Sequence, residues 1–297
     1  MSDPVPSSIE WGTLTTRRLG QLMTAIEEQR PEAADVVAAL QRQTWPGLTV
    51  GVTGPPGSGK STLISALVRE LRRRRERVGV VAVDPSSDRT GGAFLGDRLR
   101  MMEHATDADV LVRSIATRGH GGGVAPAVSD LARLLRAAGY AWVLIETVGA
   151  GQVETDVVAR ADVTLLVQAP GLGDEIQALK KGILEVADLV VVNKSDQPGA
   201  VELRRQLETW AASPERVLAT CATSGEGIAE LLQAIDARRP ERASETSRLR
   251  ARREEVRGLA LAILRDRLDA SLRDADVTRG TTWEAAERLV ASLRFEP

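Results

Sequence analysis

The sequence has few of the residues that build disulfide frameworks, soft-metal cages or base-stacking surfaces. It contains one cysteine, Cys221, and two histidines among 297 residues. A single cysteine excludes an intramolecular disulfide, and so few thiol and imidazole groups argue against a Cys/His metal cage. Aromatic residues make up 3% of the chain, which is too few for platforms that stack nucleic-acid bases.

Charge and hydropathy exclude two further classes of protein. The formal net charge is −2, so the chain has no overall basic field to attract nucleic acid or a membrane surface. No apolar run approaches the roughly 20 residues that span a bilayer, and the N-terminal MSDPVPSS has no hydrophobic signal core. We therefore expect a soluble, cytoplasmic protein that uses neither nucleic acid nor membrane as a partner.

The strongest local signal is a glycine-rich loop between an apolar run and a helical pattern. Leu48–Val52 predicts a buried strand, and Leu63, Leu67 and Leu71 have helical spacing. Between them stand Gly54, Pro55, Pro56, Gly57, Ser58, Gly59, Lys60, Ser61 and Thr62. This is the G-x-x-x-x-G-K-[ST] phosphate-binding loop, in which backbone N–H groups and a helix N-terminus face phosphate oxygens. We expect Lys60 to reach the β- and γ-phosphates of a nucleoside triphosphate and the Ser61 hydroxyl to bind Mg²⁺.

A second signal follows the predicted strand Ala141–Glu146. The strand ends in an acid, and Gly149 comes three residues later. This order is typical of a Walker B acid followed by a glycine that senses the γ-phosphate, although most such sites carry Asp rather than Glu. We expect Glu146 to hold Mg²⁺ through a water and the Gly149 N–H to face the γ-phosphate.

The base is indicated by Asn193-Lys194-Ser195-Asp196, which follows the predicted strand Leu189–Val192. The Asp196 carboxylate can accept hydrogen bonds from guanine N1 and N2. Adenine offers an acceptor at N1 and has no amino group at position 2, so a carboxylate there would be left unpaired. We expect Asn193 to bond the base and brace the phosphate loop, and the Lys194 stem to cover the ring. The predicted ligands are therefore GTP and GDP.

A guanine-facing loop is expected after the last predicted strand, Val217–Ala219. Cys221, Ala222 and Thr223 stand where a Ser-Ala-type loop would place a backbone N–H against guanine O6. We expect Cys221 to be a small, inert residue there.

The alternation of strands and helices predicts a doubly wound, mostly parallel α/β sheet with helical extensions at both ends. We expect an N-terminal helical extension over residues 1–46, a P-loop domain over 47–240 and a C-terminal helical arm over 241–297. The pattern of Arg248–Arg273 leaves two interpretations open, a packing helix or a dimerisation arm. The arginines at 72–75 and 77 likewise indicate either a solvated helix end or a patch for polyanions.

Several segments together resemble the MeaB/ArgK family of P-loop GTPases, which assist adenosylcobalamin-dependent acyl-CoA mutases. They are GPPGSGKST, DPSSDRTGGAFLGDRLRM, ETVGAGQVE, PGLGDEIQALKKGI and NKSD, within Trp45–Ile235. The resemblance implies that Asp84, Asp97 and Glu146 serve hydrolysis, with Ser61, Asp97 and Glu146 around Mg²⁺. It implies three switch segments, Asp84–Asp97, Glu146–Glu154 and Ala169–Lys180, the third coupling nucleotide state to the mutase. It also implies a homodimer formed through the C-terminal helices.

The sequence departs from the family pattern at three positions: Gly121, Pro126 and Cys221, the last replacing the usual Ser. No arginine finger or catalytic glutamine is evident, and Gln152 is the one candidate for positioning water. We therefore expect slow GTP hydrolysis that a partner stimulates.

The expected function is a GTP-hydrolysing chaperone that gates cofactor loading or protection of a mutase of the methylmalonyl-CoA type. One alternative, a nickel metallochaperone GTPase, would call for a His-rich tract or a Cys-x-x-Cys site. A second, a phosphotransferase acting on a transport protein, would call for ATP preference, against which Asp196 argues. A GTP-binding scaffold without activity would call for damaged phosphate motifs.

Overall fold

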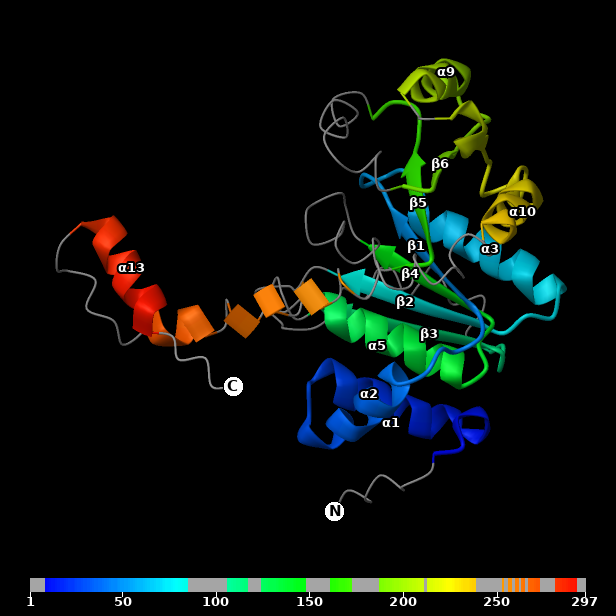
Figure 1. Ribbon diagram of the computed structural model, residues 1–297. Coiled ribbons are helices and arrows are strands. Elements are labelled where there is room, and N and C mark those ends of the chain that lie inside the picture. The colour runs from blue at the N-terminus through cyan, green and yellow to red at the C-terminus, as the bar shows by residue number, and fades with distance from the viewer. Residues whose placement is uncertain are drawn as a thin grey trace.

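A parallel β-sheet with helices on both faces forms the body of the molecule (Figure 1). The computed structural model describes residues 9–84, 106–116, 124–147, 161–172, 187–210, 213–238 and 281–292, with 253, 256–257, 260–261, 263–264 and 267–272. Within these residues the sheet has seven strands in the order β3-β2-β4-β1-β5-β6-β7. The strands are β1 (Leu48–Thr53), β2 (Val78–Asp84), β3 (Val110–Ala116), β4 (Trp142–Thr147), β5 (Val163–Gln168), β6 (Leu189–Val192) and β7 (Val217–Ala219). The prediction of a doubly wound α/β sheet is confirmed.

The helices divide between the two faces as right-handed crossovers require. The α-helices are α1 (Thr16–Glu27), α2 (Ala34–Gln41), α3 (Lys60–Arg73), α5 (Val124–Ala137), α9 (Ala200–Trp210), α10 (Ile228–Ala237) and α13 (Thr282–Ser292), and the 3₁₀ turns are η1 (Trp11–Thr13), η2 (Pro31–Ala33) and η4 (Pro214–Arg216). The connection from β1 to β2 runs one way along the sheet and places α3 on one face. The connections from β3 to β4 and from β6 to β7 run the other way, so α5 and α9 lie on the opposite face.

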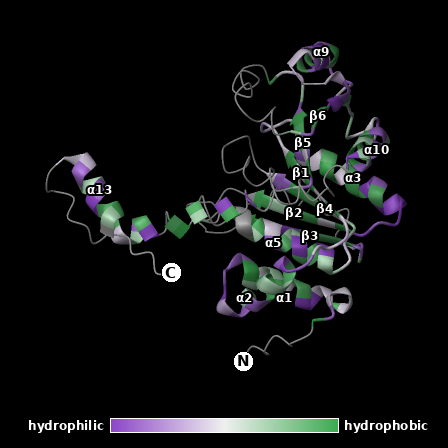
Figure 2. Ribbon diagram, in the orientation of Figure 1, coloured by the Kyte–Doolittle hydropathy of each residue, from purple (hydrophilic) through white to green (hydrophobic). Residues whose placement is uncertain are grey.

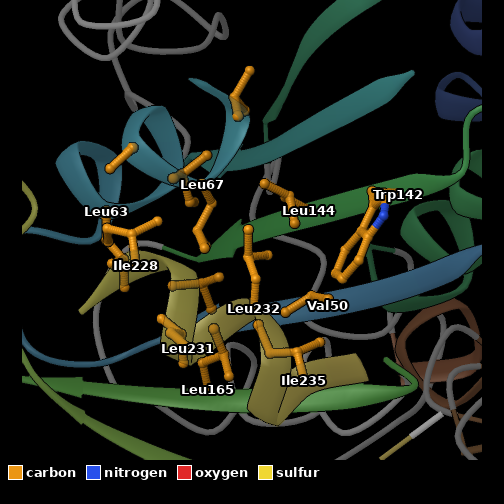
Figure 3. Close-up of a cluster of buried hydrophobic side chains, with 14 of the residues drawn as sticks. Val50, Leu63, Leu67, Trp142, Leu144, Leu165, Ile228, Leu231, Leu232 and Ile235 are labelled. Carbon is orange, nitrogen blue, oxygen red and sulfur yellow. The ribbon is translucent and has the colours of Figure 1, made fainter. Parts of the chain in front are cut away.

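Alternate residues of each strand supply the cores on the two faces. Val50, Leu144 and Leu165 point to the α3 side of the sheet. There they pack with Leu67 of α3 and with Leu232 of α10 (Figure 3). The intervening residues of β2 and β4 pack against α5 and the N-terminal helices. Both faces are therefore buried, and this explains why the strands read as continuous apolar runs. Figure 2 shows hydrophobic strands at the centre and hydrophilic residues on the outer helices.

The N-terminal helices α1 and α2 pack mainly on α5, and α1 also contacts β3 (Figure 1). The apolar stripe of α1, including Leu19 and Met23, is buried there. Gln41 donates a 3.0 Å hydrogen bond to Asp130 of α5, and Arg113 of β3 forms an ion pair with Glu27. The extension thus forms a third layer on the side of the molecule away from α3.

Two aspartates fix the starts of β5 and β6. Asp162 accepts a 2.8 Å hydrogen bond from the Thr49 N–H and returns one from its own N–H to the Thr49 carbonyl. Asp188 makes the same pair of bonds to Thr164, at 2.8 and 2.9 Å. These exchanges set the register of β1, β5 and β6, and hence which side chains reach the opposite, carboxyl edge.

The arginines at the end of α3 are engaged by neighbouring groups. Arg72 bonds Asp107 at 2.8 Å and Asp109 at 2.7 Å, and the Asp107 bond is the main reason that its pKa is raised. The Arg77 guanidinium lies over the Tyr140 ring, 4.3 Å from its centre. These contacts favour the solvated-helix-end interpretation over a polyanion patch.

The C-terminal segment carries exposed apolar side chains. They are Val256, Leu261, Ile263, Leu272, Trp283 and Val290. The described residues between 253 and 272 are helical, as predicted for Arg248–Arg273, and hydrophobic and hydrophilic residues alternate along the segment (Figure 2). In the part of the chain that the structure describes, no helix is both long and apolar enough to cross a membrane.

Candidate nucleotide-binding site

The predicted motifs converge on the carboxyl edge of the central strands. The phosphate loop follows β1, Glu146 lies near the end of β4, Asn193 follows β6, and Cys221 follows β7. Because all the strands run parallel, their carboxyl ends meet at one edge, where open α/β sheets bind ligands. The elements that the sequence places far apart therefore belong to one site.

The phosphate loop folds through backbone conformations and close approaches that glycine alone permits. Gly54 and Gly59 have φ angles of 144° and 89°. A side chain on Gly54 would collide with the carbonyl of Val167 on β5, and one on Gly59 would collide with the amide of Asn193. The loop is thus wedged against β5 and the segment after β6, and α3 begins immediately after it at Lys60.

The Lys60 side chain folds back against the first residues of the phosphate loop. Its ammonium donates hydrogen bonds to the carbonyls of Gly54 at 2.9 Å and Pro55 at 3.1 Å, and 8% of the residue is exposed. The positive charge is therefore held against the carbonyls at the start of the loop, and α3 begins at the same residue. A positive charge beside a helix N-terminus attracts a phosphate chain.

Ser61 and Glu146 come together beside this cradle. The Ser61 hydroxyl donates a 2.5 Å hydrogen bond to the Glu146 carboxylate, although the two residues are 85 positions apart in sequence. Both residues are buried. A hydroxyl and a carboxylate oxygen are the hard ligands that Mg²⁺ prefers, so this pair fits the ion that the sequence predicts.

Asn193 joins the phosphate loop to the loop after β7. Its amide nitrogen donates to the carbonyls of Ser58 at 3.0 Å and Gly59 at 3.4 Å. Its amide oxygen accepts from the Thr220 hydroxyl and from the Ala222 N–H, both at 3.2 Å. The predicted brace on the phosphate loop is present, and the same side chain also holds the second loop.

Lys194 and Asp196 flank this brace. Lys194 has a left-handed φ of 57°, and its ammonium reaches the Gly57 carbonyl at 2.8 Å. The Asp196 side chain is exposed at the edge, and one of its oxygens accepts a 3.2 Å hydrogen bond from the Cys221 thiol. Cys221 is therefore in contact with the residue predicted to read the base, which its expected inert role does not include.

The backbone of the Cys221–Thr223 segment is partly engaged with the protein itself. The Cys221 N–H donates to the Glu226 carbonyl at 3.0 Å, while the Ala222 N–H donates to Asn193. The bond to Glu226 lies within the loop after β7, whereas the bond to Asn193 joins two loops that the sequence places 29 residues apart, and sequence reasoning missed both.

The other predicted site residues lie outside the part of the chain that the structure describes, or at its ends. Asp84 ends β2, and its side chain is outside the described residues. Asp97, Gly149 and Gln152 also lie outside them, as do Gly121 and most of the three predicted switch segments. Their proposed roles remain predictions.

The fold and the loop at its carboxyl edge define the class of P-loop nucleoside triphosphatases. The chain belongs to the MeaB family: the model described as methylmalonyl Co-A mutase-associated GTPase MeaB matches residues 19–276. This confirms the resemblance given by the motifs, and the family is one of GTPases.

Individual relatives agree with this assignment. The chain is 41% identical over 271 residues to a putative GTPase of Pyrococcus abyssi, covering 86% of this chain and 84% of the relative. It is 38% identical over 235 residues to GTPase ArgK of Escherichia coli, covering 73% and 70%. A crystal structure of LAO/AO transport system kinase matches with a TM-score of 0.67 and 27% identity, covering 93% of this chain and 92% of that one.

Proposed function

We propose that this protein binds and hydrolyses GTP, and that its GTP and GDP states gate cofactor loading or protection of an adenosylcobalamin-dependent acyl-CoA mutase. Membership of a mutase-associated GTPase family supports the assignment of the partner class. The observation that carries the nucleotide assignment is the Asn193 amide. It bonds the phosphate loop through Ser58 and the loop after β7 through Ala222, so the two loops that would hold the phosphates and the base stand in a fixed relation.

Hydrolysis would rest on charge placed around the terminal phosphates. Lys60, held over the loop, and the N–H groups at the start of α3 would neutralise the charge that develops on the phosphate oxygens. Ser61 and Glu146, with Asp97, would hold Mg²⁺, which supplies further neutralisation when bound. Asp84 and Gln152 are the residues we propose for orienting the attacking water.

Guanine selectivity would come from Asp196. Its carboxylate can accept from N1 and N2 of guanine, whereas adenine presents an acceptor at N1 and no amino group at position 2. The Lys194 stem, tied to Gly57, crosses the region between the base side and the phosphate loop. The contact of a backbone N–H of Cys221–Thr223 with guanine O6 remains part of the proposal.

We further propose a homodimer built through the C-terminal arm. Trp283 is 74% exposed and Val290 57% exposed on α13. The two residues are seven positions apart on one helix and so lie on the same face, and an exposed apolar face is typical of a surface that binds a partner. A second copy of the chain is the partner that the resemblance to the family implies.

Two other functions are less well supported. The related LAO/AO transport system kinase raises a phosphotransferase role, but an acid at position 196 suits guanine better than adenine. A nickel metallochaperone would hold its metal cargo in a ligand cluster. Among the described residues no group of three or more His, Cys, Asp or Glu side chains is arranged to hold a metal.

The experiment is GTP turnover by the purified chain, alone and with methylmalonyl-CoA mutase from the same organism. We expect slow GTP turnover, faster with the mutase, no ATP turnover, and none by Lys60→Ala. If the mutase leaves GTP turnover unchanged, the chain is a GTPase but this mutase is not its partner. If ATP is turned over as fast as GTP, Asp196 does not select guanine.

A further inference from the structure

We propose that Gln168, the last residue of β5, is a positioning residue whose side-chain amide stabilises the GTP-bound state of the protein. This inference rests on the proposed binding of GTP. The observation that carries it is a buried amide. Gln168 is 0% exposed, and neither its side-chain nitrogen nor its side-chain oxygen has a hydrogen-bond partner among the residues that the structure describes.

The Gln168 side chain lies on the face of the sheet opposite α3. Its strand neighbours Leu165 and Val167 pack on the α3 side, and successive side chains alternate between the faces of a strand. In the register of the sheet, Gln168 stands opposite Val192 of β6, and Leu166 precedes it on the same face. Both of these residues are fully buried. They are apolar, so their side chains offer the amide neither a donor nor an acceptor.

An amide in such a place destabilises the structure in which it is found. It carries two N–H donors and a carbonyl oxygen with two lone pairs. Each buried polar atom without a partner has lost its hydrogen bonds to water, whereas a leucine of similar length has no such atom to desolvate. A residue that lowers stability in one state is expected where it serves another state of the protein. The amide therefore points to a second state in which it is hydrogen-bonded.

The backbone at the end of β5 contacts both parts of the proposed nucleotide site. The Gln168 carbonyl accepts a 2.8 Å hydrogen bond from the Asn193 N–H. The Val167 carbonyl lies so close to Gly54 that any side chain on this glycine would collide with it. A displacement of the phosphate loop when phosphate binds would therefore act directly on the end of β5, and with it on the Gln168 side chain.

The turn after β5 also lies against the phosphate loop. Its glycine, Gly171, has a left-handed φ of 85°. The Leu172 side chain lies 3.9 Å from the position that a β-carbon would take on Gly57. This turn belongs to the segment Ala169–Lys180, the third predicted switch. The amide of Gln168 thus stands at the junction between the phosphate loop and a segment predicted to change with the nucleotide.

The hydrogen bonds that the amide gains in the GTP-bound state would contribute to the affinity for GTP. A ligand shifts an equilibrium between two states only by the difference in free energy that it meets in them. A group without partners before GTP binds, and with partners afterwards, adds to that difference. GDP lacks the γ-phosphate and would leave the amide without partners. Gln168 should therefore raise the affinity for GTP more than the affinity for GDP.

The test replaces the amide by an apolar side chain of similar length in the full-length chain. For Gln168→Leu we expect the affinity for a non-hydrolysable GTP analogue to fall about 5- to 30-fold, and the affinity for GDP to change by less than about twofold. The melting temperature without nucleotide should rise, because a buried amide without partners has been removed. Gln168→Met, with an unbranched side chain, should repeat both effects.

Thr164→Val is the matched control. Thr164 is a buried polar residue on the same face of β5, near the end of the strand away from the site. Its replacement should leave the preference for the GTP analogue over GDP unchanged.

Three outcomes would overturn the proposal. An equal loss of affinity for the GTP analogue and for GDP would mean that Gln168 only supports the phosphate loop. Unchanged affinity for both would mean that the amide plays no part in binding. A lower melting temperature of both variants without nucleotide would show that the amide already has partners in that state. Wild-type protein that binds neither nucleotide would instead reject the proposed function.

Discussion

At the scale of single residues, the short hydrogen bond between Ser61 and Glu146 marks the place that we propose for Mg²⁺. The hydroxyl and the carboxylate lie 2.5 Å apart in a buried position at the start of α3. Mg²⁺, which we propose binds to these two oxygens, would add positive charge beside the loop in which phosphate is expected.

Replacing Glu146 by Gln tests whether the negative charge of this side chain, rather than its size, is needed for GTP hydrolysis. The amide keeps the size of the side chain and can still accept from Ser61, but the negative charge is lost. We expect GTP hydrolysis to fall about 10- to 100-fold and the Mg²⁺ needed for half-maximal activity to rise. A magnesium titration of GTP turnover measures both. Glu70→Gln, at the far end of α3, is the matched control, and an unchanged Mg²⁺ requirement in Glu146→Gln would count against this site.

Some of the site could be predicted residue by residue, because its signals are local. The phosphate loop and Asn193–Asp196 are short segments whose chemistry follows from their own residues and flanks. The pairing of Ser61 with Glu146 was expected from shared roles, but its distance depends on the register of β1 and β4. The thiol contact on Asp196 was not foreseen, since it requires two loops, 25 residues apart, to meet.

At the scale of elements, the edge opposite the site is held by side chains that imitate strand pairing. Asp162 and Asp188 each accept a hydrogen bond from the N–H of the second residue of a neighbouring strand, Thr49 of β1 and Thr164 of β5. Their hydrogen bonds are charge-assisted, which makes them stronger than ordinary backbone pairs. The register that they set is transmitted along the strands to the carboxyl edge.

Removing either carboxylate should destabilise the protein without disturbing the site chemistry directly. For Asp162→Ala and Asp188→Ala we expect the free energy of unfolding to fall by about 1–3 kcal/mol. Urea unfolding measures this, with Asp269→Ala, an exposed aspartate of the C-terminal arm, as the control. Losses no larger than the control's would show that these bonds do not anchor the strands.

The elements differ in how far the sequence determines them. β6 and β7 begin and end where predicted, because each is an apolar run bounded by polar residues. Helix α9 was missed, since Leu203 and Leu207 are its main apolar core positions and its remaining surface is mostly polar. The buried residues Ala200, Leu203 and Leu207 do have helical spacing, which the sequence analysis did not use.

At the scale of the whole molecule, the sheet with its helices buries its apolar surface, whereas the C-terminal helical segment leaves apolar side chains exposed. The sheet is covered on both faces, whereas the arm leaves Leu261, Trp283 and others exposed. If a second copy covers this surface, the arm becomes the dimer interface. The alternative of a simple packing helix would leave these side chains in water.

The oligomeric state tests the arm directly. We expect sedimentation to report a dimer for the wild-type chain and a monomer for the double variant Trp283→Asp, Val290→Asp. An alanine replacement at Arg288, a polar position on the same helix, should leave the dimer intact. A wild-type chain that sediments as a monomer at micromolar concentration would reject the dimerisation proposal.

In the proposed site, the loop after β1 binds phosphate and the loops after β6 and β7 bind guanine. The most direct measurement is equilibrium binding of GDP and ADP to the wild-type chain and to Asp196→Ala. We predict that the wild type prefers GDP by more than about 100-fold and that Asp196→Ala loses most of this preference, because the carboxylate supplies the discrimination. Equal affinity of the wild type for GDP and ADP would mean that Asp196 does not select guanine.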